Sequence, residues 1–324
     1  MFSFKDCQEI INKRLEAIRL PENPKNLYEP IRYVISLGGK RIRPALVLMA
    51  CNMFSDKVEN AINPAIAVEL LHNFTLLHDD IMDQSDLRRN KPTVHKKWNS
   101  NIAILSGDAM MIKAYEFLFS SDPDILKDIL LVFNKTALEI CEGQQYDMDF
   151  ESESVVSVES YLKMIELKTA VLLAASLKMG AICGKSNAAD ADLLYSFGKN
   201  LGIAFQLQDD LLDVYGDTEL IGKQTGNDIV ANKKTFLLLT ALNLVKGEKQ
   251  KQLKYWLENG NAEKDKKIKN VKTFFDELKI KEKTEKEILK YYKIALQSLE
   301  SIKCDKNRKI PIYQFTEELM QRKK

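Results

Sequence analysis

The chain has 324 residues, of which 45% are hydrophobic and 29% charged, so it has ample material for a large core and a wetted surface. Glycine and proline are scarce, with 13 and 8 residues, and the turns that many short strands would need are therefore missing. The net charge of only +2 argues against bulk nucleic-acid binding, which usually requires a strongly basic domain, although it leaves room for a local basic site.

Cysteine usage and the chain ends bear on the compartment. Five cysteines are dispersed without a CxxC pair, which is typical of reduced thiols in a cytosolic protein. The first residues contain no basic segment followed by an apolar one, so no signal peptide is predicted. The most apolar stretch, 171–183, is interrupted by Lys178 and is too short to cross a bilayer. We therefore expect a cytoplasmic protein without a transmembrane segment.

Helical periodicity recurs along almost the whole chain. The predicted helices are roughly 4–19, 28–37, 42–54, 61–83, 98–120, 123–149, 158–183, 187–213, 234–246, 249–258, 264–278, 282–302 and 312–322. No repeat of fixed period and no long linker is visible. We therefore interpret residues 1–324 as one all-α domain, with the most apolar helices near 61–83, 98–118, 161–183 and 190–213 at its centre.

The first functional signal along the chain is the segment Gly38-Gly39-Lys40-Arg41-Ile42-Arg43-Pro44, at a tight break before a helix. Glycines let a backbone approach a ligand, and a helix N-terminus favours anions. By itself this is a weak phosphate signal, and it is not a P-loop. The next polar residue of interest, His72, would by pattern alone be an ordinary core histidine.

Two acidic motifs end two apolar helices. Both Asp79-Asp80-Ile81-Met82-Asp83 and Asp209-Asp210-Leu211-Leu212-Asp213 have the pattern DDxxD. Aspartates four residues apart on a helix lie on one face and repel each other, and neither motif contains a basic residue. Carboxylates open to water and phosphate suit Mg²⁺. A single motif could equally be a solvated acidic helix end, but two copies after apolar runs disfavour that interpretation. Two such clusters facing each other would bind a diphosphate through metal from both sides.

Basic residues are interleaved with these motifs. Arg88-Arg89 follows the first acidic motif, Lys168-Thr169 lies on a later core helix, and Lys223 and Lys233 follow the second motif. Each alone would be interpreted as a surface charge. Together with the acidic motifs they indicate two anion pockets, one reached through metal and one bound directly by lysine and arginine.

These motifs together resemble the trans-polyprenyl diphosphate synthase family over about residues 38–234. The segments that carry the resemblance are the two aspartate-rich regions, 77–93 and 205–213, the mid-chain element Gly143-Gln144-Gln145-Tyr146-Asp147, and the lysine loop from Gly222-Lys223 to Asn232-Lys233. Asn90 is a departure, because glycine is usual after the arginine pair. The departure should affect loop geometry more than chemistry.

The resemblance implies a role for each matching residue. The metal ligands for three Mg²⁺ ions would be Asp79, Asp83 and Asp209, supported by Asp80, Asp210 and Asp213. The allylic diphosphate would be bound by Arg88, Lys168, Lys223 and Lys233. Isopentenyl diphosphate would be bound by Lys40, Arg43, His72 and Arg89. The reacting end would be lined by Thr169 and Gln206, with Gln144 and Asp147 behind them, and Phe205 would bind substrate. The family fold is a bundle of antiparallel helices around a deep cavity, usually as a homodimer.

The same resemblance implies the chemistry. The allylic diphosphate ionises to an allylic carbocation, isopentenyl diphosphate attacks it head to tail, and a proton is then lost. The protein would supply positioning, charge stabilisation and exclusion of water.

We expect product length to depend on the residues that precede the first acidic motif on the same helix. At about 1.5 Å per residue, Phe74 lies roughly 7–8 Å below Asp79, where a ring can close the floor of a cavity, although it could also be a core residue. Thr75 beside it is small and Leu71, nearly one turn deeper, is moderate. In the family, one aromatic here with no insertion in DDxxD resembles a geranylgeranyl diphosphate synthase. We expect a twenty-carbon product, with fifteen carbons (farnesyl diphosphate) as the alternative and a longer chain less favoured.

Two other classes of function stay open. A class I terpene cyclase shares the helical fold and the first DDxxD, but its second motif usually mixes Asn, Ser or Thr with Glu. A non-catalytic subunit of a heteromeric synthase tends to lose aspartates from these motifs, and this chain keeps all six. Both alternatives therefore rank below a synthase.

Overall fold

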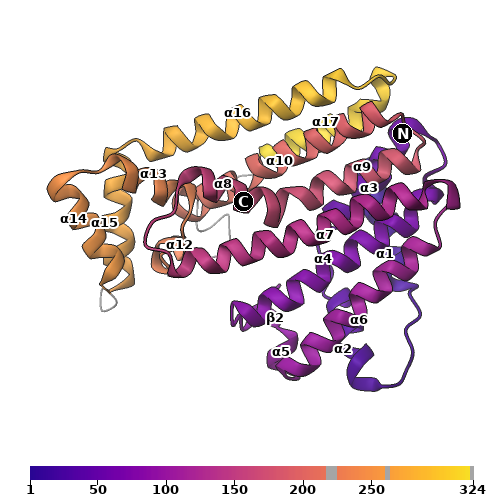
Figure 1. Ribbon diagram of the computed structural model, residues 1–324, viewed down its shortest axis with the longest axis horizontal. Helices are drawn as coiled ribbons and strands as arrows, with labels where there is room; N and C mark the ends of the chain where they lie inside the picture. Colours follow the sequence, from indigo (N-terminus) through magenta and orange to yellow (C-terminus); the bar gives the residue numbers. More distant parts are fainter. Residues whose placement is uncertain (217–224, 260–262, 322–324) are drawn as a thin grey trace. The chain divides into compact units, whose positions relative to one another are not determined.

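The structure, a computed structural model, describes residues 1–216, 225–259 and 263–321, and nearly all of the regular structure in them is helical (Figure 1). The predicted all-α class is confirmed. In chain order the elements are α1 (Phe4–Glu16), α2 (Lys25–Ser36), α3 (Ile42–Phe54), the 3-10 helix η1 (Val58–Ala61), α4 (Ile62–Met82), β1 (Leu87–Arg88), β2 (Lys91–Pro92), α5 (Val94–Lys97), α6 (Ser100–Phe119), α7 (Pro123–Ser152), α8 (Val158–Ile165), the π-helical turn η2 (Glu166–Ala170), α9 (Val171–Cys183), α10 (Ala188–Tyr215), α12 (Asn227–Val230), α13 (Phe236–Leu244), α14 (Gly247–Glu258), α15 (Lys264–Glu277), α16 (Ile280–Ser301) and α17 (Lys306–Met320).

Most predicted helices match, and the differences have local causes. The helix predicted over 158–183 is continuous, but it contains the π-helical turn η2. The last helix begins at Lys306, six residues earlier than predicted, and carries Pro311 inside it. The proline removes the hydrogen bond that an N–H at this position would make to the Asn307 carbonyl, but the helix continues past it to Met320. The hairpin β1–β2 and the short helices η1, α5 and α12 were not predicted.

The described chain divides into two compact units, each assembled from several segments. Unit 1 comprises 1–137, 175–195 and 302–313, and unit 2 comprises 138–174, 196–301 and 314–324. Each unit is described by itself. The single domain expected from the sequence stays a prediction.

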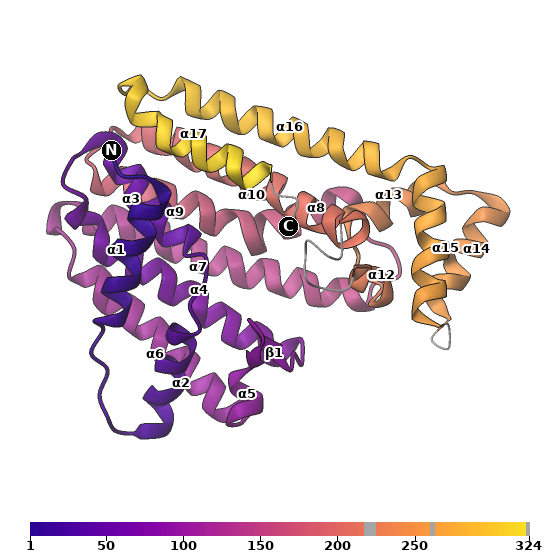
Figure 2. The same cartoon turned by 180° about the vertical axis from the view of Figure 1, so that it is seen from behind.

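The core of unit 1 is built on α3, α4 and α6. Every residue of α3 from Pro44 to Met53 is buried, and α4 packs along α6. Figure 2 shows α4 and α6 running beside each other, with the hairpin at the end of α4. Part of α9 also belongs to this unit, and a Cβ on Gly180 would lie 2.2 Å from the Val47 carbonyl oxygen. This glycine therefore lets α9 approach the backbone of α3.

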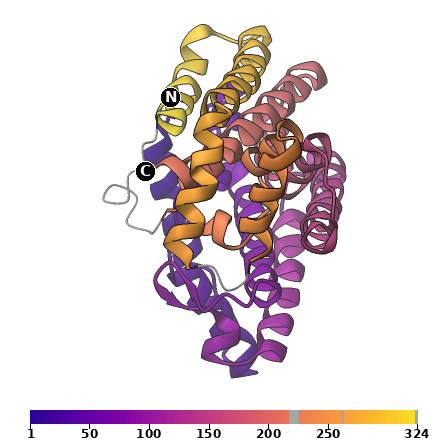
Figure 3. The ribbon, with the colours of Figure 1, turned by 90° about the vertical axis from the view of Figure 1, so that its left-hand side faces the viewer.

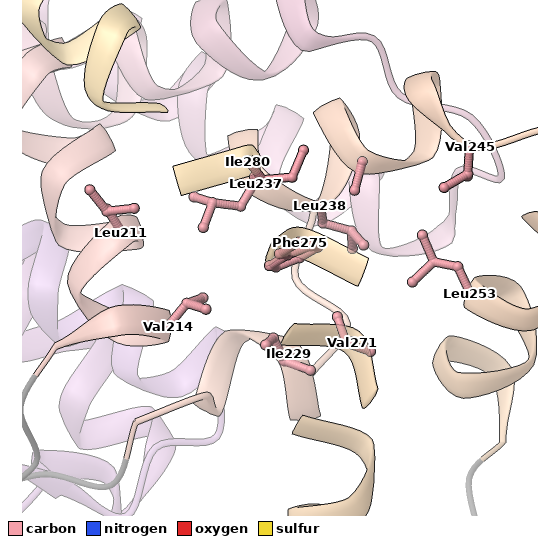
Figure 4. Close-up of a cluster of buried hydrophobic side chains, with 11 residues drawn as sticks. Leu211, Val214, Ile229, Leu237, Leu238, Val245, Leu253, Val271, Phe275 and Ile280 are labelled. Atoms are coloured by element: carbon pink, nitrogen blue, oxygen red, sulfur yellow. The ribbon is translucent and has the colours of Figure 1, made fainter. Parts of the chain in front are cut away.

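The core of unit 2 contains two clusters of buried apolar side chains. In the first, Tyr161, Met164 and Ile165 of α8 pack with Ile203 and Leu207 of α10. The second holds the last turn of α10 through Leu211 and Val214, against side chains of α12, α13, α15 and α16 (Figure 4). Both clusters fix the end of α10, which carries the second aspartate motif. Further along the chain, α14 and α15 pack side by side (Figure 1, Figure 3).

All five cysteines are free thiols, in agreement with the sequence prediction. Cys7, Cys51 and Cys183 are buried, Cys304 is partly buried and Cys141, on α7, is exposed. Burial raises the pKa of the Cys7 and Cys51 thiols to about 12 and raises that of Cys183 as well.

Candidate active site

The first aspartate motif forms the last turn of α4. Asp79 is partly buried, Asp80 is only 6% exposed, and Asp83 is the exposed C-cap residue, whose backbone N–H donates to the Asp79 carbonyl at 2.8 Å. The C-terminal end of a helix carries a partial negative charge, which adds to that of the carboxylates. This helix end therefore attracts cations.

The buried carboxylate of this motif is paired with an arginine. Arg88 Nη2 donates to Asp80 Oδ1 at 2.6 Å, and Arg88 Nε lies 3.0 and 3.2 Å from the two carboxylate oxygens. Such two-pronged pairing is the geometry in which a guanidinium binds a carboxylate best. The structure therefore brings two predicted site residues together, with Arg88 neutralising Asp80.

Arg88 is held in place by the small hairpin that follows α4. Leu87 pairs with Pro92 and Arg88 with Lys91, and the two residues between the strands, Arg89 and Asn90, both have positive φ, 54° and 59°. A two-residue turn of this kind requires residues that tolerate the left-handed region, and asparagine is one of them. The asparagine that replaces the usual glycine is thus compatible with the turn.

The second arginine of the hairpin contacts the glycine-rich segment. A Cβ placed on Gly39, whose φ is +141°, would lie 2.6 Å from Arg89 Nη2 and 2.8 Å from its Cζ. The guanidinium therefore occupies the space that a side chain on Gly39 would fill. Two segments that the sequence linked only by resemblance, 38–44 and 88–89, are in contact.

Arg43 and His72 form the centre of a positively charged cluster. Arg43 Nη1 lies 3.2 Å from His72 Nε2, so the arginine donates and the imidazole accepts. Burial, reinforced by Arg43, Arg89 and Arg88, holds the pKa of His72 well below its usual range. Among the described residues, Arg43 Nε is a buried donor without a hydrogen-bond partner. A neutral histidine among arginines, beside an unused buried donor, is suited to an anion.

Beneath this cluster lies a buried ion pair that sequence reasoning missed. Arg41, the N-cap residue of α3, has a φ of 49°, and its Nη1 pairs with the carboxylate of Glu69 on α4. Glu69 also accepts from Asn73 Nδ2 at 3.1 Å, and its charge opposes the lowering of the Arg43 and Arg89 pKa values that burial causes. An acidic residue inside the apolar run 64–71 was the available signal.

The residues predicted to set product length lie on α4, one to two turns before the motif. Leu71 is fully buried, whereas Phe74 and Thr75 are partly buried. Phe74 meets the ring of His78 edge to face, with centroids 4.6 Å apart. A Cβ on Gly107 of α6 would lie 2.5 Å from His78 Nε2, so that glycine makes room for the imidazole.

The second aspartate motif lies near the end of α10, and its second aspartate is again the most buried of the three. Asp209 is exposed, Asp210 is only 4% exposed, and Asp213 is partly buried. Asp210 accepts two hydrogen bonds, one from the Tyr161 hydroxyl to Oδ2 and one from Gln206 Nε2 to Oδ1 at 3.1 Å. Burial raises the pKa of the Asp210 carboxyl to about 6, while these two donors oppose the rise.

The hydrogen-bond network continues to the π-helical turn. The Thr169 hydroxyl donates to Gln206 Oε1 at 3.3 Å, so Thr169, Gln206 and Asp210 are brought together as a connected group. In the same turn, Lys168 Nζ pairs with Asp147 Oδ2 at 2.5 Å. A π-helical turn often marks a functional site, because it changes the direction of the side chains that follow.

The mid-chain glycine explains how α7 reaches this turn. A Cβ on Gly143 would lie 2.3 Å from the backbone nitrogen of Lys168, so any side chain would displace the backbone. Gln144, next along α7, is buried, and Asp147 lies one turn after Gly143. The sequence element 143–147 therefore combines a close backbone approach with the carboxylate that pairs with Lys168.

A fourth carboxylate near the second motif was missed. The Asp228 backbone N–H donates to Asp213 Oδ2 at 3.0 Å. Burial raises the pKa of the Asp228 side chain to about 7, and the charge of Lys233 opposes the rise. The signal was an aspartate between the two lysines of the predicted loop. Lys233 is exposed, and its charge acts on both Asp210 and Asp228.

Three predicted residues remain to be located. Lys40 is exposed at the glycine-rich segment, and its carbonyl accepts from Gln8 Nε2 at 2.9 Å. Phe205 is partly buried on α10. Lys223 lies outside the described residues.

The donor set fits a hard divalent cation. The outer aspartates Asp79, Asp83 and Asp209 offer oxygen ligands at or near helix C-termini and are at least partly exposed. Among residues 1–216, 225–259 and 263–321, no three His, Cys, Asp or Glu side chains gather into a complete metal cage. Mg²⁺ typically binds through one or two carboxylates together with water and substrate phosphates, so such a cage is not needed.

An all-helical fold, two DDxxD helix ends and an arginine cluster suited to anions define a class of protein, the prenyltransferases that act on diphosphates. The model of the polyprenyl synthetase family matches residues 24–274. A geranylgeranyl diphosphate synthase of Methanosarcina mazei is 43% identical over 239 residues, 73% of this chain and 74% of that protein. A geranylfarnesyl diphosphate synthase of Natronomonas pharaonis is 38% identical over 253 residues, 72% of this chain and 74% of that protein. This chain belongs to the polyprenyl synthetase family.

Solved structures agree with this family membership. A crystal structure of a geranylgeranyl pyrophosphate synthase superposes with a TM-score of 0.94 at 43% identity, covering 100% of both chains. A second crystal structure is of a geranylgeranyl pyrophosphate synthase from Corynebacterium glutamicum, complexed with isoprenyl diphosphate and magnesium. It has a TM-score of 0.86 at 26% identity, covering 99% of this chain and 100% of the other. Family members depend on Mg²⁺ and use isoprenyl diphosphates. No helix in the described part of the chain is long and apolar enough to cross a membrane.

Proposed function

We propose that this chain is a geranylgeranyl diphosphate synthase, which joins isopentenyl diphosphate head to tail to an allylic diphosphate until the product has twenty carbons. The observation that carries the proposal is the pair of complete DDxxD motifs, each near the end of a long helix, with a buried, hydrogen-bonded central aspartate and a more exposed outer one. The similar geranylgeranyl synthases described above support the same activity.

In this proposal Asp79, Asp83 and Asp209 hold three Mg²⁺ ions, with Asp80, Asp210 and Asp213 in support. Bound Mg²⁺ supplies charge neutralisation that makes the allylic diphosphate a better leaving group. Support for the division of labour comes from burial, since the two middle aspartates already have protein partners. They shape the site, and the outer ones bind metal.

The basic residues bind the two substrates. Arg88 engages Asp80 through Nε and Nη2, which leaves Nη1 to bind the allylic diphosphate together with Lys168, Lys223 and Lys233. The arginine cluster binds isopentenyl diphosphate through Lys40, Arg43, His72 and Arg89. The buried Arg43 Nε and the neutral His72 support this assignment.

The reaction then follows from charge and position. The carbon–oxygen bond of the allylic diphosphate breaks and its electron pair leaves with the diphosphate. The double bond of isopentenyl diphosphate attacks the allylic cation, and a proton leaves the new adduct for the released diphosphate. Thr169, Phe205 and Gln206 line the reacting end, where oxygen dipoles stabilise positive charge and the apolar wall excludes water.

The assay that tests this function uses the purified full chain with Mg²⁺, isopentenyl diphosphate and each allylic primer in turn, followed by mass spectrometry of the products. Geranylgeranyl diphosphate from the chain alone is the expected result. Product that forms from an allylic diphosphate without isopentenyl diphosphate would instead identify a cyclase. An inactive chain that becomes active only with a second protein would identify a subunit of a heteromeric synthase.

The product length rests on Phe74, with farnesyl diphosphate as the alternative. Its ring is partly buried and packs against His78, so removing it opens space along α4. Phe74→Ala should therefore lengthen the product by at least one five-carbon unit. Phe54→Ala, an aromatic at the end of α3, is the matched control and should keep the wild-type product. An unchanged product with Phe74→Ala would remove this residue as the floor.

We also propose a homodimer in the cytoplasm. On α6, Leu105, Ile112 and Phe119 are 60%, 63% and 63% exposed and recur every seven residues, a spacing that forms one apolar face. Light scattering should give twice the chain mass, and Leu105→Glu with Ile112→Glu should give the monomer mass. Leu289→Glu, at an exposed site on α16, is the control. A monomeric wild-type chain contradicts the dimer. The cytoplasmic assignment is supported by the free thiols.

A further inference from the structure

A tyrosine outside every predicted motif is bonded to the second aspartate motif. Tyr161, on α8, is 1% exposed, and its hydroxyl donates to Asp210 Oδ2. Its ring packs within the cluster that joins α8 to α10, so the phenol has a fixed position. Burial beside Asp210 raises the pKa of the Tyr161 hydroxyl well above its usual value, which keeps it a donor at any physiological pH.

The tyrosine determines how the rest of the network is directed. One carboxylate oxygen of Asp210 accepts from Tyr161, and the other accepts from Gln206 Nε2. Because an ionised carboxylate only accepts, Gln206 must turn its amide nitrogen toward Asp210 and its carbonyl oxygen away. That carbonyl is the acceptor for the Thr169 hydroxyl, at 3.3 Å.

We propose that Tyr161 is a positioning residue for the prenyl transfer: through Asp210 it orients the Gln206 amide, and through Gln206 it directs the Thr169 hydroxyl hydrogen away from the reacting end. The proposal rests on the proposed function for its chemical consequence. The oxygen lone pairs of Thr169 are then left to face developing positive charge, because its hydrogen is committed to Gln206. Tyr161 itself does not touch substrate in this scheme.

The phenylalanine variant isolates the hydroxyl. Tyr161→Phe keeps the ring in its cluster and removes one donor from a charged acceptor, so kcat should fall about 10- to 100-fold. The KM for isopentenyl diphosphate should stay within about threefold of wild type, because its proposed ligands Arg43 and His72 are not part of this network. The matched control is Tyr215→Phe, which also removes a tyrosine–aspartate hydrogen bond, to Asp276 at 2.8 Å, and should keep wild-type kcat.

A double-mutant cycle separates positioning from mere stability. If Tyr161 acts through Gln206, then Tyr161→Phe combined with Gln206→Leu should be no slower than Gln206→Leu alone, within about twofold. A purely structural contribution from Tyr161 would instead multiply the two losses. Multiplied losses, or a kcat for Tyr161→Phe equal to that of wild type, overturn the proposal.

A spectrum of the resting protein tests the link without turnover. In ¹⁵N-glutamine-labelled protein, the side-chain NH₂ signals of Gln206 are assigned from their absence in Gln206→Leu. Tyr161→Phe should shift or broaden these signals, whereas Tyr215→Phe should leave them in place. Unmoved Gln206 signals in Tyr161→Phe refute the proposal. A wild-type chain that makes no product would refute the proposed function alone, since this spectrum would still decide whether Tyr161 orients Gln206.

Discussion

The two aspartate motifs share one five-residue pattern but have different surroundings. In both, the second aspartate is buried and the protein holds its carboxylate. In the first motif the partner is the cation Arg88, and in the second the partners are the neutral groups of Tyr161 and Gln206. The two motifs therefore share a buried second aspartate, while the surrounding elements decide which outer aspartate is the more exposed and whether the buried charge is neutralised.

This difference has an electrostatic consequence. Asp80 lies against a guanidinium, so its negative charge is balanced inside the protein. Asp210 is hydrogen-bonded to Tyr161 and Gln206, which are both neutral. Burial raises the pKa of its carboxyl to about 6. Below about pH 6 the Asp210 carboxyl is therefore protonated and the second motif loses one negative charge.

The largest effect is expected where the motifs are alike. Asp79→Ala or Asp209→Ala removes an outer ligand from the proposed metal site and should lower kcat by about 10³-fold or more. Circular dichroism should show an intact helical fold, because both side chains lie outside the buried core. Asp128→Ala, exposed on α7, is the control. Near-normal turnover in either variant contradicts the metal assignment.

The next effect tests the arginines that distinguish the first motif. Gly39→Ala places a Cβ 2.6 Å from Arg89 Nη2 and should displace the guanidinium, raising the KM for isopentenyl diphosphate about tenfold. Gly38→Ala is matched, since Gly38 also has a positive φ, 72°, but a Cβ there meets nothing within 4 Å. Steady-state kinetics on both variants separate displacement of Arg89 from backbone strain. Equal KM values for the two variants count against this role of Arg89.

A third test measures how much each buried carboxylate contributes to the stability of the folded protein when metal is absent. Asp80→Asn leaves Arg88 without its anionic partner and should lower the free energy of unfolding by about 1–3 kcal/mol. Asp210→Asn removes a buried charge that is held by the neutral donors Tyr161 and Gln206, and Gln206 can turn its amide to suit, so the change should stay within about 1 kcal/mol. Urea unfolding in EDTA measures both. A larger loss for Asp210→Asn would reverse the comparison.

The smallest effect is a pH dependence. The folded-state pKa of Asp210 is raised to about 6 from an ordinary 3.8, so the folded protein holds this proton more tightly than the unfolded chain. The resulting stability is complete below about pH 4 and is lost as pH rises through about 6. The melting temperature of wild type, measured relative to that of Asp210→Asn in EDTA, should therefore fall by a few degrees between about pH 4 and 7. About 2–4 °C is expected for each kcal/mol of stability lost. A difference that is flat or rises with pH contradicts the raised pKa.

The sequence predicted the features that depend on spacing along a helix. The all-α class, the long helices that carry the motifs and the paired DDxxD ends all follow from periodicity and local composition. The hairpin at 87–92 was missed because each strand has only two residues, and the Asp80–Arg88 contact depends on that hairpin. The Tyr161–Asp210 bond joins residues 49 positions apart, a contact that no local pattern encodes. The π-helical turn at Lys168 has no composition that distinguishes it from an α-helix.

The distribution of the cysteines makes this chain suitable for site-selective labelling without any substitution. Alkylating reagents attack the thiolate, so the buried, high-pKa thiols of Cys7, Cys51 and Cys183 should react slowly. Cys141 is exposed on α7, about one turn before Gln144. A fluorophore attached there would report on the helix whose Asp147 pairs with Lys168, and its emission could follow substrate binding in the native sequence.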